Sequence, residues 1–187
     1  MPLIPTGELV AQARANGRGI GAFNAICLEH AEAIALGAEA AGQSAIIQIS
    51  ENAVKFHRRQ LGPLAMACAQ VARGSSAALA LHLDHVEDIE LLHQADDFGF
   101  GSVMYDGSTL AYADNVAATR DAVVWGHSHG LWVESELGEV GGKDGAHAPG
   151  VRTDPAEAAA FVAATGVDGL AVAVGSSHAM LDRSAAL

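Results

Sequence analysis

Three clusters of polar residues in this sequence could carry chemistry, and each of them follows an apolar run. LHLDHVED places Asp84 and His85 shortly after the run AALAL. WVESELGEVGG places Glu134 and Glu136 two residues apart, and therefore on the same side of a strand. AVAVGSSHAM places His178 after a Gly-Ser-Ser turn. Imidazole and carboxylate groups from separate strand ends are typical ligands of a divalent metal, so the pattern favours a site made by His85, Glu136 and His178.

The first two clusters also have a structural interpretation. Asp84 could cap a helix that begins at Val86, and the two glutamates could belong to an edge strand with a solvated face. His82 lies within a strand, so we expect it to be packed and hydrogen-bonded rather than catalytic. The other histidines fall on helices or loops without a visible partner and are interpreted as structural or surface residues: His30, His57, His93, His127, His129 and His147.

The composition narrows the class of protein. A chain of 187 residues, half of them apolar, fits one globular domain with a sizeable core. The formal net charge of -12 argues against nucleic acid or an anionic membrane as the main partner. Cys27 and Cys68 lack CxxC spacing, which argues against a disulfide framework or a zinc ribbon. Neither a signal peptide nor a membrane-length apolar run is visible, so we expect a cytoplasmic protein.

Short apolar runs alternate with Ala-rich segments of helical period, which indicates repeated βαβ units and a parallel sheet. Helix starts are expected at Ser108 or Thr109 and at Thr153 or Asp154, just before Pro155. The predicted strands are 19–25, 45–49, 77–83, 101–105, 131–136 and 169–174, and the predicted helices lie near 28–42, 57–73, 86–98, 108–126 and 154–165, with stop signals at Gly42, Gly74 and Gly166.

A parallel sheet of this kind is either an open doubly wound sheet or a barrel. The first strand is not followed by a GxGxxG fingerprint, which argues against a dinucleotide site. Polar residues follow several different strands, as in a barrel whose active site is built from strand ends: Asn24, Ser50, Asp84, His85, Asp106, Glu134, Glu136 and His178. We therefore predict an α/β fold, a (β/α)8 TIM barrel of which residues 1–187 form about the first six β/α units as a single domain.

The motifs resemble those of a known family, the class II, metal-dependent ketose-bisphosphate aldolases of the fructose-1,6-bisphosphate and tagatose-1,6-bisphosphate type. LALHLDHVED resembles the family's apolar run ending in His-x-Asp-His. VESELGEVGGKDG resembles its Glu-x-Glu-Leu-Gly motif, which a Gly-Gly loop follows. Further matches occur in order at AFNA, QIS, GFGSVMYDGS and TGVDGLAVAVGSSHA, so the resemblance covers essentially the whole chain.

The resemblance implies a reaction and a role for the central residues. Asp84 would be the general acid/base acting on the hydroxyl beside the cleaved C–C bond. His85 and His178 would bind zinc or another divalent metal, with Glu136 as a ligand or a nearby carboxylate that moves in when substrate is absent. The implied reaction is the reversible cleavage of a ketose 1,6-bisphosphate into dihydroxyacetone phosphate and an aldehyde phosphate. Zinc would polarise the ketone and stabilise the enediolate.

The resemblance also implies substrate contacts, at Asn24, Ser50, Gly175 and Ala179. The family usually has glycine at the position of Ala179, where the backbone approaches a phosphate or a monovalent cation. Asp144 stands where the second motif usually has glutamate, a loop acid implicated in proton transfer. The expected partners are a phosphorylated ketose or dihydroxyacetone phosphate and further copies of the same chain in a homo-oligomer.

The family's pattern continues beyond this sequence. A further zinc histidine and the phosphate-binding loops belong to its seventh and eighth units, which we expect to be lost, processed away or supplied by another chain. Two alternatives to the aldolase interpretation therefore stay open. One is a catalytically inactive, truncated barrel that acts only as a binding or oligomerising module, and the other is a related metal-dependent lyase acting on another sugar phosphate.

Overall fold

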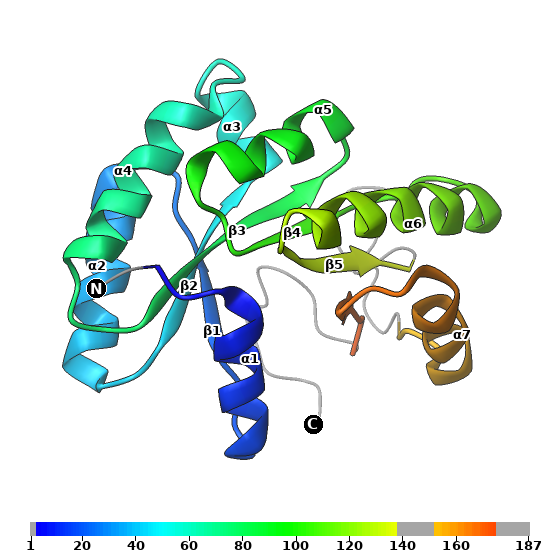
Figure 1. Ribbon diagram of the computed structural model, residues 1–187, viewed down its shortest axis with the longest axis horizontal. Helices are drawn as coiled ribbons and strands as arrows, with labels where there is room; N and C mark the ends of the chain where they lie inside the picture. Colours follow the sequence, from blue (N-terminus) through cyan, green and yellow to red (C-terminus); the bar gives the residue numbers. More distant parts are fainter. Residues whose placement is uncertain (1–2, 138–151, 175–187) are drawn as a thin grey trace.

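The computed structural model describes residues 3–137 and 152–174, which form one curled sheet with most of its helices packed on the outer face (Figure 1). The six strands lie in sequence order and every neighbouring pair is parallel. A doubly wound sheet would reverse its strand order part-way, so this order favours a barrel-type winding. The strands are β1 (Gly21–Asn24), β2 (Ala45–Ser50), β3 (Leu79–Val86), β4 (Ser102–Tyr105), β5 (Trp132–Glu136) and β6 (Gly169–Ala171).

The helices follow the predicted alternation, with four local differences, of which the start of α6 is taken up below. One helix, α1, was not predicted, and α3 begins at Glu51 because Ser50 caps it by accepting a hydrogen bond from the Ala53 N–H. The segment 86–98 forms two short helices instead of one. The helices are α1 (Thr6–Ala15), α2 (Leu28–Ala41), α3 (Glu51–Phe56), α4 (Leu61–Gly74), α5 (Ile89–Leu92), the 3₁₀ helix η1 (His93–Phe98), α6 (Tyr112–Ser128) and α7 (Pro155–Thr165).

The start of α6 differs from the prediction for a physical reason. Ser108 does not open the helix, because its N–H and its hydroxyl both donate to Oδ1 of Asp106, at 3.1 and 2.6 Å. The helix begins at Tyr112 instead. At the start of α7, Asp154 is the capping residue, and its Oδ1 accepts from the N–H groups of Ala156 and Glu157. The predicted helix start at Thr153 or Asp154 is confirmed.

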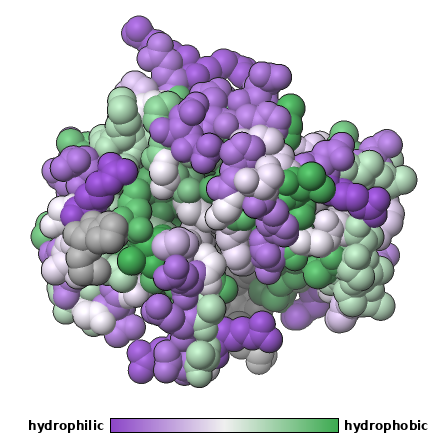
Figure 2. All heavy atoms as spheres, in the orientation of Figure 1, coloured by the Kyte–Doolittle hydropathy of each residue, from purple (hydrophilic) through white to green (hydrophobic). Residues whose placement is uncertain are grey.

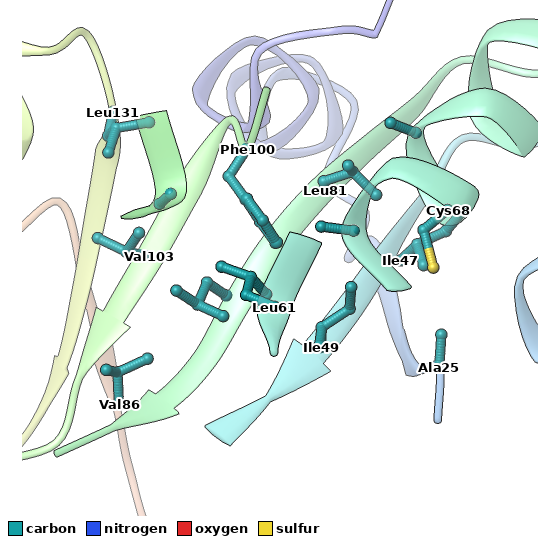
Figure 3. Packing of buried hydrophobic residues seen from close by; sticks show 14 of the residues in the cluster. Ala25, Ile47, Ile49, Leu61, Cys68, Leu81, Val86, Phe100, Val103 and Leu131 are labelled. Atoms are coloured by element: carbon teal, nitrogen blue, oxygen red, sulfur yellow. The ribbon is translucent and has the colours of Figure 1, made fainter. Parts of the chain in front are cut away.

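The main core lies between the sheet and the outer helices (Figure 3). Alternate residues of β3 take part in it, including Leu81 and Leu83, which are fully buried. The intervening residue Ala80 packs instead with Leu9 of α1 and Ile46 of β2. Because side chains alternate along a strand, His82 and Asp84 lie on the same face of β3 as Ala80. The helix α1 therefore covers one end of that inner face, and the polar residues lie further along it.

None of the helices in the described residues is long and apolar enough to cross a lipid bilayer. Hydrophilic side chains cover much of the face shown in Figure 2, with hydrophobic side chains visible between them.

Candidate metal and acid–base site

A break in the geometry of β3 brings Asp84 and His85 into one site. The pairing of β3 with β4 is regular at Leu83, shifts, and resumes where Val86 pairs with Tyr105. His85 lies in the shift with a φ of 50°, in the left-handed region. On a regular strand, adjacent side chains would point to opposite faces. The irregular backbone instead lets Asp84 contact β2 while His85 reaches the residue that follows β4.

The alternative role of Asp84 as a helix cap is wrong. β3 extends to Val86, so Asp84 lies within the strand. The cap of α5 is Asp88, whose Oδ1 accepts a hydrogen bond from the Glu90 N–H at 3.0 Å. The edge-strand interpretation of Glu134 and Glu136 is also wrong, because β5 pairs with β4 on one side and with β6 on the other.

His85, Asp106 and Glu136 form a compact group at the ends of β3, β4 and β5. Nδ1 of His85 is 3.1 Å from Oδ2 of Asp106 and 3.6 Å from Oε2 of Glu136. One ligand atom from each residue lies within 4.8 Å of the other two. The two carboxylates are buried and the imidazole is half-exposed. Two buried carboxylates need a compensating positive charge, and this donor set fits a divalent cation.

The imidazole of His85 can supply that positive charge itself. Its hydrogen bond with Asp106 raises the pKa of His85 to about 9, helped by the charges of Asp84 and Glu136 and opposed by burial. His85 is therefore protonated at neutral pH when no cation is bound. Since only a neutral imidazole can bind a metal, cation binding at this group would release the proton.

Asp84 belongs to a second group, on the inner face of β1, β2 and β3. Nε2 of Gln48 donates to Oδ2 of Asp84 at 3.0 Å and to Oδ1 of Asn24 at 3.3 Å. Asp84 is 7% exposed, so its carboxylate is screened from bulk water on most sides. The Gln48 amide therefore orients the Asp84 carboxylate and engages the carbonyl oxygen of Asn24, which leaves the Asn24 amide nitrogen available as a donor.

His82 connects Asp84 to a buried row of hydroxyl groups. Nδ1 of His82 lies 2.8 Å from the Ser102 hydroxyl, which in turn donates to the hydroxyl of Thr6 at 2.8 Å. Because the Ser102 hydroxyl donates its proton to Thr6, it accepts in its bond with His82, so Nδ1 of His82 carries the proton of that bond. Nε2 of His82 faces Oδ1 of Asp84 at 3.7 Å and Oε2 of Glu134 at 3.8 Å. The prediction that His82 is packed and hydrogen-bonded is confirmed.

Burial raises the pKa of Glu134, and the charge of Asp84 adds to the effect while His82 and His85 oppose it. The carboxyl groups of Asp84 and Glu134 and the imidazole of His82 thus lie close together on the inner face of the sheet. Such an arrangement of titratable groups on one sheet face is typical of an acid–base site.

Comparison with known proteins identifies the family. The model of the class-II fructose-bisphosphate aldolases matches residues 4–187. The chain belongs to this family. It is 39% identical over 181 residues to a fructose-bisphosphate aldolase of Thermus caldophilus, covering 94% of this chain and 58% of that protein. It is 36% identical over 180 residues to the Giardia intestinalis fructose-bisphosphate aldolase, covering 95% of this chain and 55% of that protein.

Solved structures support the same conclusion about the fold of this class-II aldolase chain. A putative fructose-1,6-biphosphate aldolase from Coccidioides immitis matches with a TM-score of 0.81 and 32% identity, over 96% of this chain and 63% of that one. The YdjI aldolase from Escherichia coli K12 matches with a TM-score of 0.79 and 29% identity, over 92% and 62%. The predicted fold, about six units of a (β/α)8 barrel, is confirmed. The chain spans less than two thirds of the length of these relatives.

The structure brings together several of the residues singled out in the aldolase motifs. His85 and Glu136 are within 3.6 Å, Asp84 precedes His85, and Ser50 lies opposite Asp84 in the register of β2 with β3. The site residues that lie outside the described residues are Asp144, Gly175, His178 and Ala179.

Sequence reasoning missed two contributors to the site. Asp106 was noted at a strand end but not as a ligand, although it follows SVMY in a motif shared with the aldolase family. Gln48 was missed as well, and its signal was a single polar residue within the apolar run AIIQI. Five of the histidines without a visible partner in the sequence have contacts in the fold, as His127 shows by its 2.9 Å contact with Asp168, and His147 lies outside the described residues.

Proposed function

We propose that this protein is a metal-dependent aldolase that reversibly cleaves a ketose 1,6-bisphosphate into dihydroxyacetone phosphate and an aldehyde phosphate. The observation that carries the proposal is the position of Asp84 beside the group of His85, Asp106 and Glu136, in a chain of the class-II aldolase family. The donor set supports zinc as the metal. His178 is proposed as a further ligand.

Asp84 is proposed as the general acid/base. During cleavage it takes the proton from the hydroxyl on the carbon that becomes the aldehyde, while the electrons of the broken C–C bond stay with the ketone half. During condensation it returns the proton. Oδ2 of Asp84 accepts from Gln48, and we assign the proton transfer to Oδ1, which lies 3.7 Å from Nε2 of His82. When bound, the metal acts as a Lewis acid that polarises the ketone and stabilises the developing negative charge.

The remaining residues are proposed to hold the substrate. The Asn24 amide nitrogen can donate to a substrate oxygen because its carbonyl oxygen already accepts from Gln48. The Ser50 hydroxyl accepts from the Ala53 N–H, so its own proton is free to be donated. In a chain with a net charge of -12, phosphate groups need local donors, which we assign to the backbone at Gly175 and Ala179, with a monovalent cation nearby. Asp144 is proposed to assist proton transfer. The enzyme is proposed to be a homo-oligomer.

A second candidate substrate comes from one relative. The chain is 37% identical over 180 residues to a 6-phospho-5-dehydro-2-deoxy-D-gluconate aldolase of Shouchella clausii, covering 95% of this chain and 61% of that protein. This identity is similar to that with the fructose-bisphosphate aldolases. A phosphorylated keto sugar acid, with one phosphate group and one carboxylate, is therefore the alternative substrate class for the same acid–base chemistry.

The experiment measures aldehyde and dihydroxyacetone phosphate released from fructose 1,6-bisphosphate, tagatose 1,6-bisphosphate and 6-phospho-5-dehydro-2-deoxy-D-gluconate. We expect cleavage of one of these that EDTA abolishes and zinc restores. Replacing the proposed acid/base, Asp84→Asn, should lower kcat by about 10²–10⁴-fold. Asp121→Asn, an exposed position of α6, is the control that should leave kcat unchanged. Cleavage that survives EDTA, or that Asp84→Asn does not slow, would refute the proposal.

A further inference from the structure

Glu51, the first residue of α3, has a buried carboxylate that reaches across to the end of β3. Its side chain is 7% exposed. Oε2 accepts hydrogen bonds from the backbone N–H groups of Glu87 at 2.7 Å and Asp88 at 3.2 Å. Oε1 pairs with Nζ of Lys55 at 2.7 Å, one helical turn along α3. A single carboxylate thus joins the start of α3 to the turn that leaves β3.

That turn begins two residues after His85. The left-handed backbone of His85 is costly for a residue other than glycine, by about 1–3 kcal/mol, and persists only where the surroundings hold it. On one side, Val86 is held by β4, because the Asp106 N–H donates to its carbonyl oxygen at 2.8 Å. On the other side, the hydrogen bonds from Glu87 and Asp88 to Glu51 hold the chain.

The same turn also starts the next helix. Asp88 donates its N–H to Glu51 while its side chain caps α5 through the Glu90 N–H. The position of the turn is therefore determined from both directions. The His85 imidazole, two residues before the turn, lies 3.1 Å from Asp106 and 3.6 Å from Glu136 in this backbone conformation.

We propose that Glu51 is a positioning residue for the metal group. Its carboxylate holds the turn after β3 so that His85 keeps the left-handed conformation that points its imidazole at Asp106 and Glu136. This inference rests on the metal site proposed above. A carboxylate suits the task because both oxygens accept, and they face two N–H groups and one ammonium group. A glutamine would turn an NH2 group toward at least one of these donors.

The test compares Glu51→Gln with Lys55→Met in the full chain. Lys55→Met keeps the carboxylate and both of its bonds to the turn, so it separates the turn contact from the ion pair. Zinc affinity is measured by competition with a chromophoric chelator, and hydrogen exchange at the Glu87 and Asp88 amides is followed by NMR. We expect Glu51→Gln to weaken zinc binding about tenfold or more and to accelerate exchange of both amides. Lys55→Met should change the affinity less than about threefold.

Weaker zinc binding caused only by a loss of stability must be distinguished from weaker binding caused by loss of the turn contact. Leu64→Ala, in the core contact of α4, serves as a folded but destabilised control and should keep the wild-type zinc affinity. If Glu51→Gln does not fold, Glu51→Asp replaces it, since the shorter carboxylate keeps its charge but not its reach to both amides. Wild-type affinity in the folded Glu51 variant overturns the inference while leaving the metal site intact. A wild-type protein that binds no zinc overturns the metal site and this inference together.

Discussion

The side chain of Asn115 on α6 supports the end of β5, and its replacement by alanine tests how strongly this contact holds Glu136 in place. Nδ2 of Asn115 donates to the carbonyl oxygen of Glu136 at 3.0 Å. Oδ1 of Asn115 accepts from the Thr119 hydroxyl at 2.9 Å. Asn115 is 1% exposed, so water cannot replace either bond in the folded protein without entering the core.

The expected loss of stability follows from the two groups that lose a hydrogen bond in Asn115→Ala, the Glu136 carbonyl oxygen and the Thr119 hydroxyl. A buried polar group without a hydrogen bond costs about 1–3 kcal/mol. The Glu136 carbonyl oxygen loses its bond from Asn115, whereas the Thr119 hydroxyl loses its acceptor but keeps a contact with Ser135 Oγ at 3.1 Å. We therefore expect Asn115→Ala to lower the free energy of unfolding by about 2–4 kcal/mol. For a chain of this length, that corresponds to a decrease in Tm of roughly 4–16 °C.

The assay is thermal unfolding followed by circular dichroism, with urea unfolding as a second measure. The control is Asp121→Ala, a surface position on the same helix, which should change stability by less than about 0.5 kcal/mol. Because Glu136 belongs to the proposed metal group, Asn115→Ala should also weaken zinc binding. If Asn115→Ala and Asp121→Ala unfold at the same temperature, the hydrogen bonds of Asn115 contribute nothing and the reasoning is refuted.

Two further predictions concern a carboxyl group and a thiol. Burial would raise the pKa of Glu51, but the Lys55 ammonium and the Glu87 and Asp88 N–H groups outweigh it and lower the pKa below its ordinary value of 4.5. The contribution of Glu51 to stability is therefore present above pH 4.5 and lost as the pH falls through the lower folded-state pKa. The difference in the free energy of unfolding between wild type and Glu51→Gln, measured by urea titration, should shrink at acidic pH. A constant difference would contradict this. Burial raises the pKa of the Cys68 thiol to about 11. Ellman's reagent at pH 8 should therefore label the half-buried Cys27 first and Cys68 only after unfolding. Equal labelling rates in the native protein would contradict this.

The alternation of strands and helices could be predicted from the sequence because its signals are local. Apolar runs, capping residues and glycines act over a few neighbours, as Gly42 and Gly166 show by ending α2 and α7 in the left-handed conformation. The ends of the strands, and hence the edge at which polar side chains gather, follow from the same signals. The proximity of His85 and Glu136 was accessible in this way, because carboxyl ends of successive parallel strands meet at one edge.

Only the tertiary structure decided which of these side chains touch. The left-handed backbone at His85 lies where the pairing of β3 with β4 shifts, next to a turn that bonds to Glu51, and no local pattern in LHLDHVED predicts it. The place of Asp106 beside His85 likewise depends on the register between β3 and β4, in which a shift of one residue would turn a side chain to the other face. Local signals determine where an element begins and ends, but the contacts of a site depend on pairings between distant segments.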